Sequence, residues 1–226
     1  MRDYTIIGLT GATGSGKSTV SGFFKENGYV IINADDIAKK ALLPDSSCLK
    51  QVCGVFGNDI LNPDGTLNRQ RLAERAFSSK ENAAMLNDIT HPWIFLQVLK
   101  MCRENIDKGN NKIVFDAPLL FESNSDIMCD CVVGVIAPKE VRMQRLIKRD
   151  GLTREQLEKR MSVQQSDEFY IGKSDFVIDG AKRLEEIQSE VESIIMQWAT
   201  PVKSSLKPYK ACGRRNTPRS RAAGDS

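Results

Sequence analysis

The stretch Thr5-Ile-Ile-Gly-Leu-Thr-Gly-Ala-Thr-Gly-Ser-Gly-Lys-Ser18 decides the fold of this chain. Its first half is a short apolar run that stops at glycines, which is typical of a buried strand. Residues 11–18 then match the pattern G-x-x-x-x-G-K-[ST]. Val20, Phe23 and Phe24 follow at helical spacing. A strand, a glycine-rich turn and a helix in this order predict a phosphate-binding loop.

The loop suits a nucleotide through its backbone and two side chains. Glycines let successive N–H groups face one anion, and the helix N-terminus adds about half a positive charge. Lys17 is placed to reach the β- and γ-phosphates, and the Ser18 hydroxyl is a hard oxygen ligand suited to Mg²⁺. The residues predicted to contact ATP are Gly11, Ala12, Thr13, Gly14, Ser15, Gly16, Lys17, Ser18 and Thr19.

Strands and helices alternate along the rest of the chain. Five short apolar strands separated by helices predict an α/β fold, with a parallel sheet covered by helices on both faces. Strands are predicted at 5–10, 29–33, 112–116, 131–136 and 176–178, and helices at 17–27, 139–150, 153–167 and 182–199.

The segment between the second and third strands, from Asp35 to about Lys108, has a mostly helical pattern. Breaks are predicted at Pro44, at the turn signal of residues 62–65, and at residues 90–92. The last break would place its proline in the first turn of a new helix, where the missing N–H is not needed.

Composition excludes several classes of protein. The 226 residues are 41% hydrophobic and 27% charged, which is typical of a globular domain. No run of about 18 apolar residues occurs, so no membrane-spanning helix is predicted. Because few residues precede the first strand, no signal peptide is expected. Six cysteines without a C-x-x-C pair, and one histidine, argue against a zinc site and for reduced thiols in a cytoplasmic protein.

Charge divides the chain into two parts. Residues 201–226 hold seven of the 32 basic residues and one of the 29 acidic residues, so this tail carries +6 and residues 1–200 carry −3. The tail has few apolar residues and is predicted to be disordered. It keeps a nucleic-acid-associated P-loop ATPase open as an alternative. Because the tail has one aromatic residue, Tyr209, and no reader motif, no specific nucleic-acid partner is expected.

Two acids follow strand ends, where ligands bind in open α/β sheets. Asp35 follows the second strand and could accept a proton from a hydroxyl, or it could cap the next helix. Asp116 ends the third strand, where it could support Mg²⁺ or simply begin a turn. Asp116 is followed by Ala-Pro-Leu rather than a D-x-x-G switch, and 111–114 lack the acid of a guanine motif. These absences favour adenine over guanine.

Basic residues cluster after the fourth strand. Arg142, Arg145 and Arg149 share one helical face, and Arg154 and Arg160 lie on the next helix. Guanidinium groups neutralise a transferred phosphoryl group well, and a mobile helical lid that carries them would exclude water. The alternative is a solvated charged face, since acids are interspersed among the arginines.

Six segments occur in the order and with the residues of a known family. Together they resemble the dephospho-coenzyme A kinase family over about residues 4–199. The segments are Gly8 to Val20, Asn33 to Ala38, Thr90 to Pro92, Asp116 to Glu122, Gln144 to Gly151, and Ser174 to Ile178.

The resemblance implies transfer of the ATP γ-phosphate to the ribose 3′-hydroxyl of dephospho-coenzyme A, the final step of coenzyme A synthesis. Another small-molecule or nucleoside monophosphate kinase of the same fold is the alternative. Asp35 would be the base, and Asn33 stands where the family has a first acid. Arg145 and Arg149 would face phosphate from the lid. The residues expected to border the acceptor are Asp35, His91, Pro118, Leu119 and Glu122, and the expected Mg²⁺ ligands are Ser18 and Asp116.

The resemblance also implies a division of the kinase domain, residues 1–200. A core would comprise about 1–45, 110–140 and 174–200, a helical substrate-binding region about 46–109, and a helical lid about 141–170. The expected partners are ATP and dephospho-coenzyme A, with no membrane. Tyr170 and Gly180 depart from the basic residue and asparagine that the family often has there.

Overall fold

The computed structural model describes residues 3–151 and 153–199. The predicted disordered tail, 201–226, lies outside the described residues. No helix in the described part of the chain is long and apolar enough to cross a membrane. The cysteines at 48, 53, 102, 129 and 131 are free thiols.

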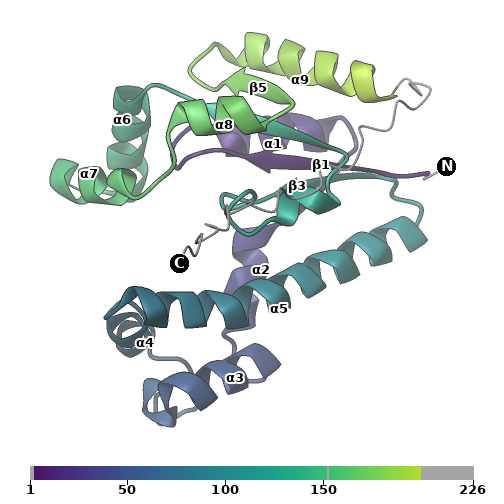
Figure 1. The fold of residues 1–226 in the computed structure, drawn as a ribbon. Helices are drawn as coiled ribbons and strands as arrows, with labels where there is room; N and C mark the ends of the chain where they lie inside the picture. Colours follow the sequence, from purple (N-terminus) through teal and green to yellow (C-terminus); the bar gives the residue numbers. More distant parts are fainter. Residues whose placement is uncertain (1–2, 152, 200–226) are drawn as a thin grey trace, which may run out of the picture.

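One parallel sheet of five strands forms the centre of the molecule (Figure 1). β1 (Thr5–Thr10) lies between β3 (Lys112–Asp116) and β4 (Cys131–Ile136). β2 (Val30–Asn33) pairs with β3 at one edge, and β5 (Phe176–Asp179) pairs with β4 at the other. The order is β2-β3-β1-β4-β5 and every pairing is parallel. The predicted α/β fold with a five-stranded parallel sheet is confirmed.

One face of the sheet is covered by α1 (Lys17–Glu26) and α9 (Leu184–Ala199). Helical spacing places the apolar residues of each helix on the side that meets the strands. Figure 1 shows α9 on the opposite side of the sheet from α5. The buried residues at this face include Ile7, Leu9, Val20, Phe24, Val114, Val133, Val135, Ile178, Ile187, Val191 and Ile194.

The other face is covered by α2 (Ala34–Ala41), α5 (Lys80–Asp107) and α8 (Asp167–Lys173). α8 packs against β4 and β5, and α5 runs beside α2. The buried residues at this face include Ile6, Ile32, Ile37, Val98, Cys102, Ile113, Phe115, Leu120, Phe121 and Tyr170.

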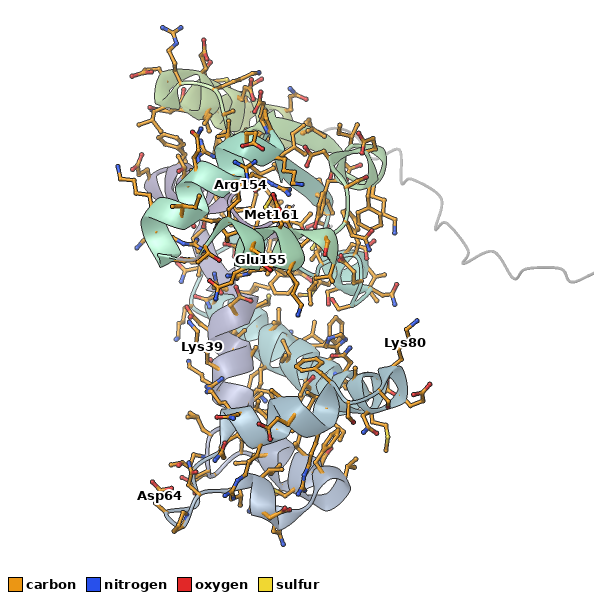
Figure 2. All side chains as sticks on the ribbon, turned by 90° about the vertical axis from the view of Figure 1, so that its left-hand side faces the viewer. Lys39, Asp64, Lys80, Arg154, Glu155 and Met161 are labelled. Atoms are coloured by element: carbon orange, nitrogen blue, oxygen red, sulfur yellow. The ribbon has the colours of Figure 1, made fainter. Side chains whose placement is uncertain are left out.

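A separate helical region lies beyond α2. α3 (Ser47–Phe56), the short helix η1 (Asn58–Ile60) and α4 (Arg69–Ala76) pack with part of α5 around their own apolar cluster. Figure 2 shows Asp64 of this region near the bottom of the molecule, well below Arg154. The buried residues of the cluster are Ala41, Cys48, Leu49, Val52, Cys53, Phe56, Ile60, Leu72 and Ala76.

A helical hairpin follows β4 and lies apart from the helical region just described (Figure 1). It consists of α6 (Lys139–Asp150) and α7 (Arg154–Ser162). Its own small core contains Met143, Leu146, Leu157 and Met161. Between β3 and β4 the chain passes through a second short helix, η2 (Ser125–Met128).

The predicted helix break at Pro92 is wrong, because α5 continues through this residue for 28 residues in all. A proline inside a helix removes one backbone hydrogen bond, here the bond to the carbonyl of Asp88. The Thr90 hydroxyl donates to the Leu86 carbonyl at 2.9 Å just before it. Packing of α5 on α2, α3 and α4 holds the helix together across the proline. The predicted breaks at Pro44 and residues 62–65 are confirmed.

The single helix predicted over 153–167 is also wrong. α7 ends at Ser162, and a new helix, α8, begins at Asp167. The Ser166 hydroxyl accepts a hydrogen bond from the Phe169 N–H and caps the new helix. Tyr170 is then buried against the sheet. Ser-Asp-Glu before an aromatic pair was the local signal for this helix start.

We expect Pro92→Ala to raise the free energy of unfolding by about 1–2 kcal/mol, because it restores a backbone donor inside a continuous helix. Urea unfolding measures the difference. The matched control is Pro44→Ala in the loop between α2 and α3. It should lower the free energy of unfolding by about 0.4–1 kcal/mol, because it raises the conformational entropy of the unfolded chain. Destabilisation by Pro92→Ala would show that α5 requires the proline.

Candidate active site

The glycine-rich loop joins β1 to α1 and bends through glycines with positive φ. Gly11, Gly14 and Gly16 have φ of 143°, 83° and 107°. A Cβ on Gly11 would lie 2.1 Å from the Val135 carbonyl oxygen, so no larger residue fits there. Gly16 precedes α1, and the free N–H groups of the first helical turn therefore face the end of the loop. This is the backbone arrangement that binds phosphate.

Asp116 lies at the centre of the strand ends and is only 5% exposed. The sheet register places it beside Leu9 of β1 and Asn33 of β2. Its Oδ1 accepts a hydrogen bond from Lys17 Nζ at 3.0 Å, and its Oδ2 lies 3.5 Å from Asn33 Nδ2. The carboxylate thereby connects the glycine-rich loop to the ends of β2 and β3.

Asn33, rather than either neighbouring acid, caps α2. Its Oδ1 accepts the backbone N–H groups of Asp35 at 2.9 Å and Asp36 at 3.2 Å. Asp36 is exposed and pairs with Lys39 at 2.8 Å, which lowers the pKa of the Asp36 carboxyl. Asp35 lines the cavity at the glycine-rich loop. Of the two roles considered for Asp35, the structure gives the capping role to Asn33.

A polar cavity of about 340 Å³ opens between the glycine-rich loop, the strand ends and the α6–α7 hairpin. Four basic side chains and two carboxylates line it, so its charge suits a polyanion. Of the predicted ATP-contacting residues, Thr19 does not line it. The lining residues are Gly11, Ala12, Thr13, Gly14, Ser15, Gly16, Lys17, Ser18, Asn33, Asp35, Asp116, Pro118, Arg145, Leu146, Arg149 and Arg160.

The side chain of Arg145 contacts the backbone of the glycine-rich loop. Its guanidinium donates to the carbonyls of Gly14 at 3.2 Å, Ser15 at 3.3 Å and Gly180 at 2.7 Å. The close approach extends to Gly180 itself, where a Cβ would lie 2.0 Å from the Ser15 carbonyl oxygen. Glycine at position 180 therefore allows the chain after β5 to contact the loop directly.

The other arginines of α6 separate in space. Arg149 lines the polar cavity and pairs with Asp150. Arg142 is only 7% exposed, lies 3.6 Å from Asp167 and packs on Gly14, without lining that cavity. Burial raises the pKa of the Asp167 carboxyl. The solvated-face alternative therefore does not describe Arg142.

One arginine of the predicted lid and one residue without a predicted site role lie near the glycine-rich loop. Arg160 of α7 lines the polar cavity. Gln164, after α7, donates through Nε2 to the Thr13 hydroxyl at 2.6 Å and so joins the hairpin to the glycine-rich loop. The contact between Gln164 and Thr13 joins residues more than a hundred positions apart, and local periodicity carries no signal for such a contact.

Two further cavities share lining residues with the polar one, and Pro118 and Leu119 line both of them. The first is mostly apolar and also contains Asp35 and His91. The second contains Glu122 and is walled by Tyr170, whose pKa burial raises to about 12. Each predicted acceptor-bordering residue therefore lines one of these cavities: Asp35, His91, Pro118, Leu119 and Glu122.

The donors around the cavity fit a magnesium ion bound with a nucleotide. Ser18 and Asp116, a hydroxyl and a carboxylate residue, both line the cavity. In the described residues no group of three or more histidine, cysteine, aspartate or glutamate residues could hold a metal alone. Mg²⁺ usually takes one or two protein oxygens together with phosphate oxygens and waters, so this sparse donor set suits it.

A parallel sheet with a phosphate-binding loop at its central strand, facing a cationic cavity, places this chain among the P-loop phosphotransferases. The family model for dephospho-CoA kinase matches residues 5–186. The chain therefore belongs to the dephospho-CoA kinase family. The predicted family and the predicted class, a kinase, are confirmed.

Curated relatives and solved structures agree with this assignment. The chain is 39% identical to dephospho-CoA kinase of Corynebacterium glutamicum, over 84% of this chain and 96% of the relative. It is 42% identical to that of Fusobacterium nucleatum, over 83% and 95%. The structure of dephospho-CoA kinase from Campylobacter jejuni aligns with a TM-score of 0.63 at 28% identity, covering 88% and 98% of the two chains. TT1252 from Thermus thermophilus aligns with a TM-score of 0.70 at 28% identity, covering 86% and 97%.

Asn33 variants test the contacts of this side chain. We expect Asn33→Ala to lower the free energy of unfolding by about 1 kcal/mol at every pH, because α2 loses its cap. Asn33→Asp keeps the cap but faces Asp116 with a second carboxylate. One of the two pKa values should then rise in the folded state, so the variant should lose stability relative to wild type as pH increases from about 4 to 8. Urea unfolding across pH measures both, and a pH-independent loss for Asn33→Asp would contradict the contact.

Proposed function

We propose that this protein transfers the γ-phosphate of ATP to the ribose 3′-hydroxyl of dephospho-coenzyme A. One observation carries the proposal beyond family membership. The cationic cavity at the glycine-rich loop and the apolar cavity beside His91 share Asp35 and Pro118. Donor and acceptor can therefore meet at one carboxylate.

ATP would bind with its phosphates on the glycine-rich loop. Backbone N–H groups and the start of α1 supply the first contacts. Lys17 pairs with Asp116 at 3.0 Å and lines the same cavity, which supports a role for its ammonium group in binding the phosphates. Arg149 and Arg160 also line this cavity, and their guanidinium groups would neutralise charge on the transferred group.

Asp35 would accept the proton of the attacking hydroxyl. Asn33 fixes the start of α2, and with it the backbone of Asp35. The acceptor would lie in the apolar cavity, with its hydroxyl between Asp35 and the γ-phosphate. Correct placement of the two reacting groups supplies a large part of the rate in phosphoryl transfer.

A magnesium ion would be held by the Ser18 hydroxyl and by Asp116, directly or through water. When bound, it would neutralise charge on the phosphates. Asp116 is held in place for this task by Lys17 and by its position in the sheet register.

The rest of the chain would divide by task, with core, helical region and lid as predicted from the sequence. The α6–α7 hairpin has its own small core, which supports its role as a lid that excludes water from the cavity. The helical region of α3, η1 and α4 has a separate core and supports the acceptor side through α5. We place the reaction, the final step of coenzyme A synthesis, in the cytoplasm.

An acceptor screen at fixed ATP distinguishes the alternatives. Dephospho-coenzyme A should be phosphorylated well and nucleoside monophosphates poorly, with the product identified by mass as gaining one phosphoryl group. Efficient phosphorylation of a nucleoside monophosphate would favour another small-molecule kinase. ATP hydrolysis stimulated by RNA or DNA would favour a nucleic-acid-associated ATPase.

Asp35→Asn should lower kcat by about 10²–10⁴-fold while ATP affinity stays near wild type, because it removes a proton acceptor and keeps the shape of the side chain. The matched control is Asp36→Asn, which changes the neighbouring acid on the exposed side of α2. A coupled assay gives kcat, and isothermal titration gives the dissociation constant of ATP. Near-normal turnover by Asp35→Asn would exclude it as the base.

Lys17→Ala should reduce kcat/KM for ATP by on the order of 10²-fold or more, through lost stabilisation of phosphate charge. It also leaves the buried Asp116 carboxylate without its cation, so we expect a measurable loss of unfolding free energy. Unfolding in urea should be measured beside the kinetics. Full activity in Lys17→Ala would contradict the phosphate-binding role.

A further inference from the structure

Two arginines on the wall of the phosphate cavity share one carboxylate. Arg149 of α6 bonds Asp150 with both ends of its guanidinium, Nε to Oδ1 at 2.6 Å and Nη2 to Oδ2 at 3.0 Å. Arg160 of α7 lies 3.5 Å from the same Oδ2 through Nη1. Both arginines line the cavity, and Asp150 does not. Asp150 therefore lies behind the two arginines and contacts the lining of the cavity through them.

These contacts join the two helices of one hairpin near its turn. Asp150 is the last residue of α6, and Gly151 ends the helix with φ of 66°. Thr153 and Gln156 then form a capping box that begins α7. A second link, Arg154 to Glu140 at 3.0 Å, joins the far end of α6 to the start of α7. Figure 2 shows Arg154, Glu155 and Met161 together on this hairpin.

Asp150 stands where helix electrostatics disfavour an acid. The C-terminal end of a helix carries partial negative charge and is stabilised by cations. The hydrogen bond from Arg149 nevertheless lowers the pKa of the Asp150 carboxyl below its usual value. The acid is thus held charged by the arginines and not by its place in the helix.

We propose that Asp150 is a positioning residue for phosphoryl transfer, whose carboxylate holds Arg149 and Arg160 together at the phosphate cavity. This inference rests on the proposed kinase function. Two guanidinium groups side by side repel each other, and each sits on a long side chain with many rotamers. A shared carboxylate offsets the repulsion and restricts both side chains. The hairpin then presents two cations as one unit to the transferred phosphoryl group.

Arg160 lies at two cavities. It lines the phosphate cavity and also the cavity that contains Glu122 and Tyr170. Its guanidinium therefore lies at the boundary between the donor side and a neighbouring acceptor cavity. A shift of this side chain would change the alignment of the reacting groups more than it would change the binding of either substrate.

Asp150→Asn is the central test. We expect kcat to fall about 10-fold with both KM values within about 2-fold of wild type, because misplaced charge stabilisation acts on the transition state more than on bound substrate. Asp150→Glu, which keeps the charge, should recover part of the loss. Glu155→Gln, an exposed acid on α7 outside these contacts, is the matched control and should match wild type. Unchanged kcat in Asp150→Asn would overturn the proposal.

Coupling to the arginines separates positioning from general stabilisation. If Asp150 acts through the arginines, Asp150→Asn should not lower kcat further in a chain that already carries Arg149→Ala and Arg160→Ala. If Asp150 only stabilises the hairpin, the fold losses in kcat caused by Asp150→Asn and by the two arginine substitutions should multiply. Independent multiplication of the effects would overturn the proposal.

A readout without turnover keeps this inference separate from the proposed function. Phenylglyoxal modifies free guanidinium groups, and mass spectrometry can follow Arg149 and Arg160 individually in the full chain. Both should react several-fold faster in Asp150→Asn than in wild type, and ATP should protect both. Equal rates in the two proteins would overturn the tethering even if transfer to dephospho-coenzyme A is observed. Failure of wild type to phosphorylate dephospho-coenzyme A, with faster modification in Asp150→Asn, would overturn only the proposed function.

Discussion

The contact between Lys17 and Asp116 is the interaction on which the site depends. It joins the first residue of α1 to the last residue of β3 at 3.0 Å. Asp116 is nearly buried, so removing its cation would leave an uncompensated charge beside the sheet. Asn33 Nδ2 lies beside the other carboxylate oxygen, and Asn33 Oδ1 caps the start of α2 by accepting the backbone N–H of Asp35. One carboxylate therefore sets the relative positions of the phosphate-binding loop and the helix that carries Asp35.

The cations of the phosphate cavity each have an anionic or carbonyl partner in the protein. Lys17 contacts Asp116, Arg145 contacts three backbone carbonyls, and Arg149 and Arg160 contact Asp150. Such partners reduce repulsion among cations gathered in one cavity and hold their side chains in place. Net charge says little about this arrangement, because the positive charge that faces the cavity is local while residues 1–200 carry −3 in total.

Local patterns predicted most of the fold. The bounds of β1, β3, β4 and α6 follow from apolar runs, turn residues and the glycine at 151. The two wrong helix predictions, the break at Pro92 and the single helix over 153–167, have a common cause, which is tertiary packing that local patterns do not contain. Pro92 favours a helix start by local rules, but packing on neighbouring helices keeps α5 continuous. The polar pattern of 153–167 suggested one helix, but α7 ends at Ser162 and Tyr170 is buried against the sheet on a separate helix, α8.

The sequence by itself determined the phosphate-binding loop and the parallel sheet, because glycine spacing and apolar periodicity act between near neighbours in the chain. Its six ordered motifs carried the resemblance to the family. The tertiary structure alone decided which polar groups work together. Arg142, Arg145 and Arg149 share a helical face in the sequence, yet one is buried beside Asp167, one holds backbone carbonyls and one shares Asp150 with α7. Strand register and helix packing determine these different partners, since they bring together residues far apart in the chain.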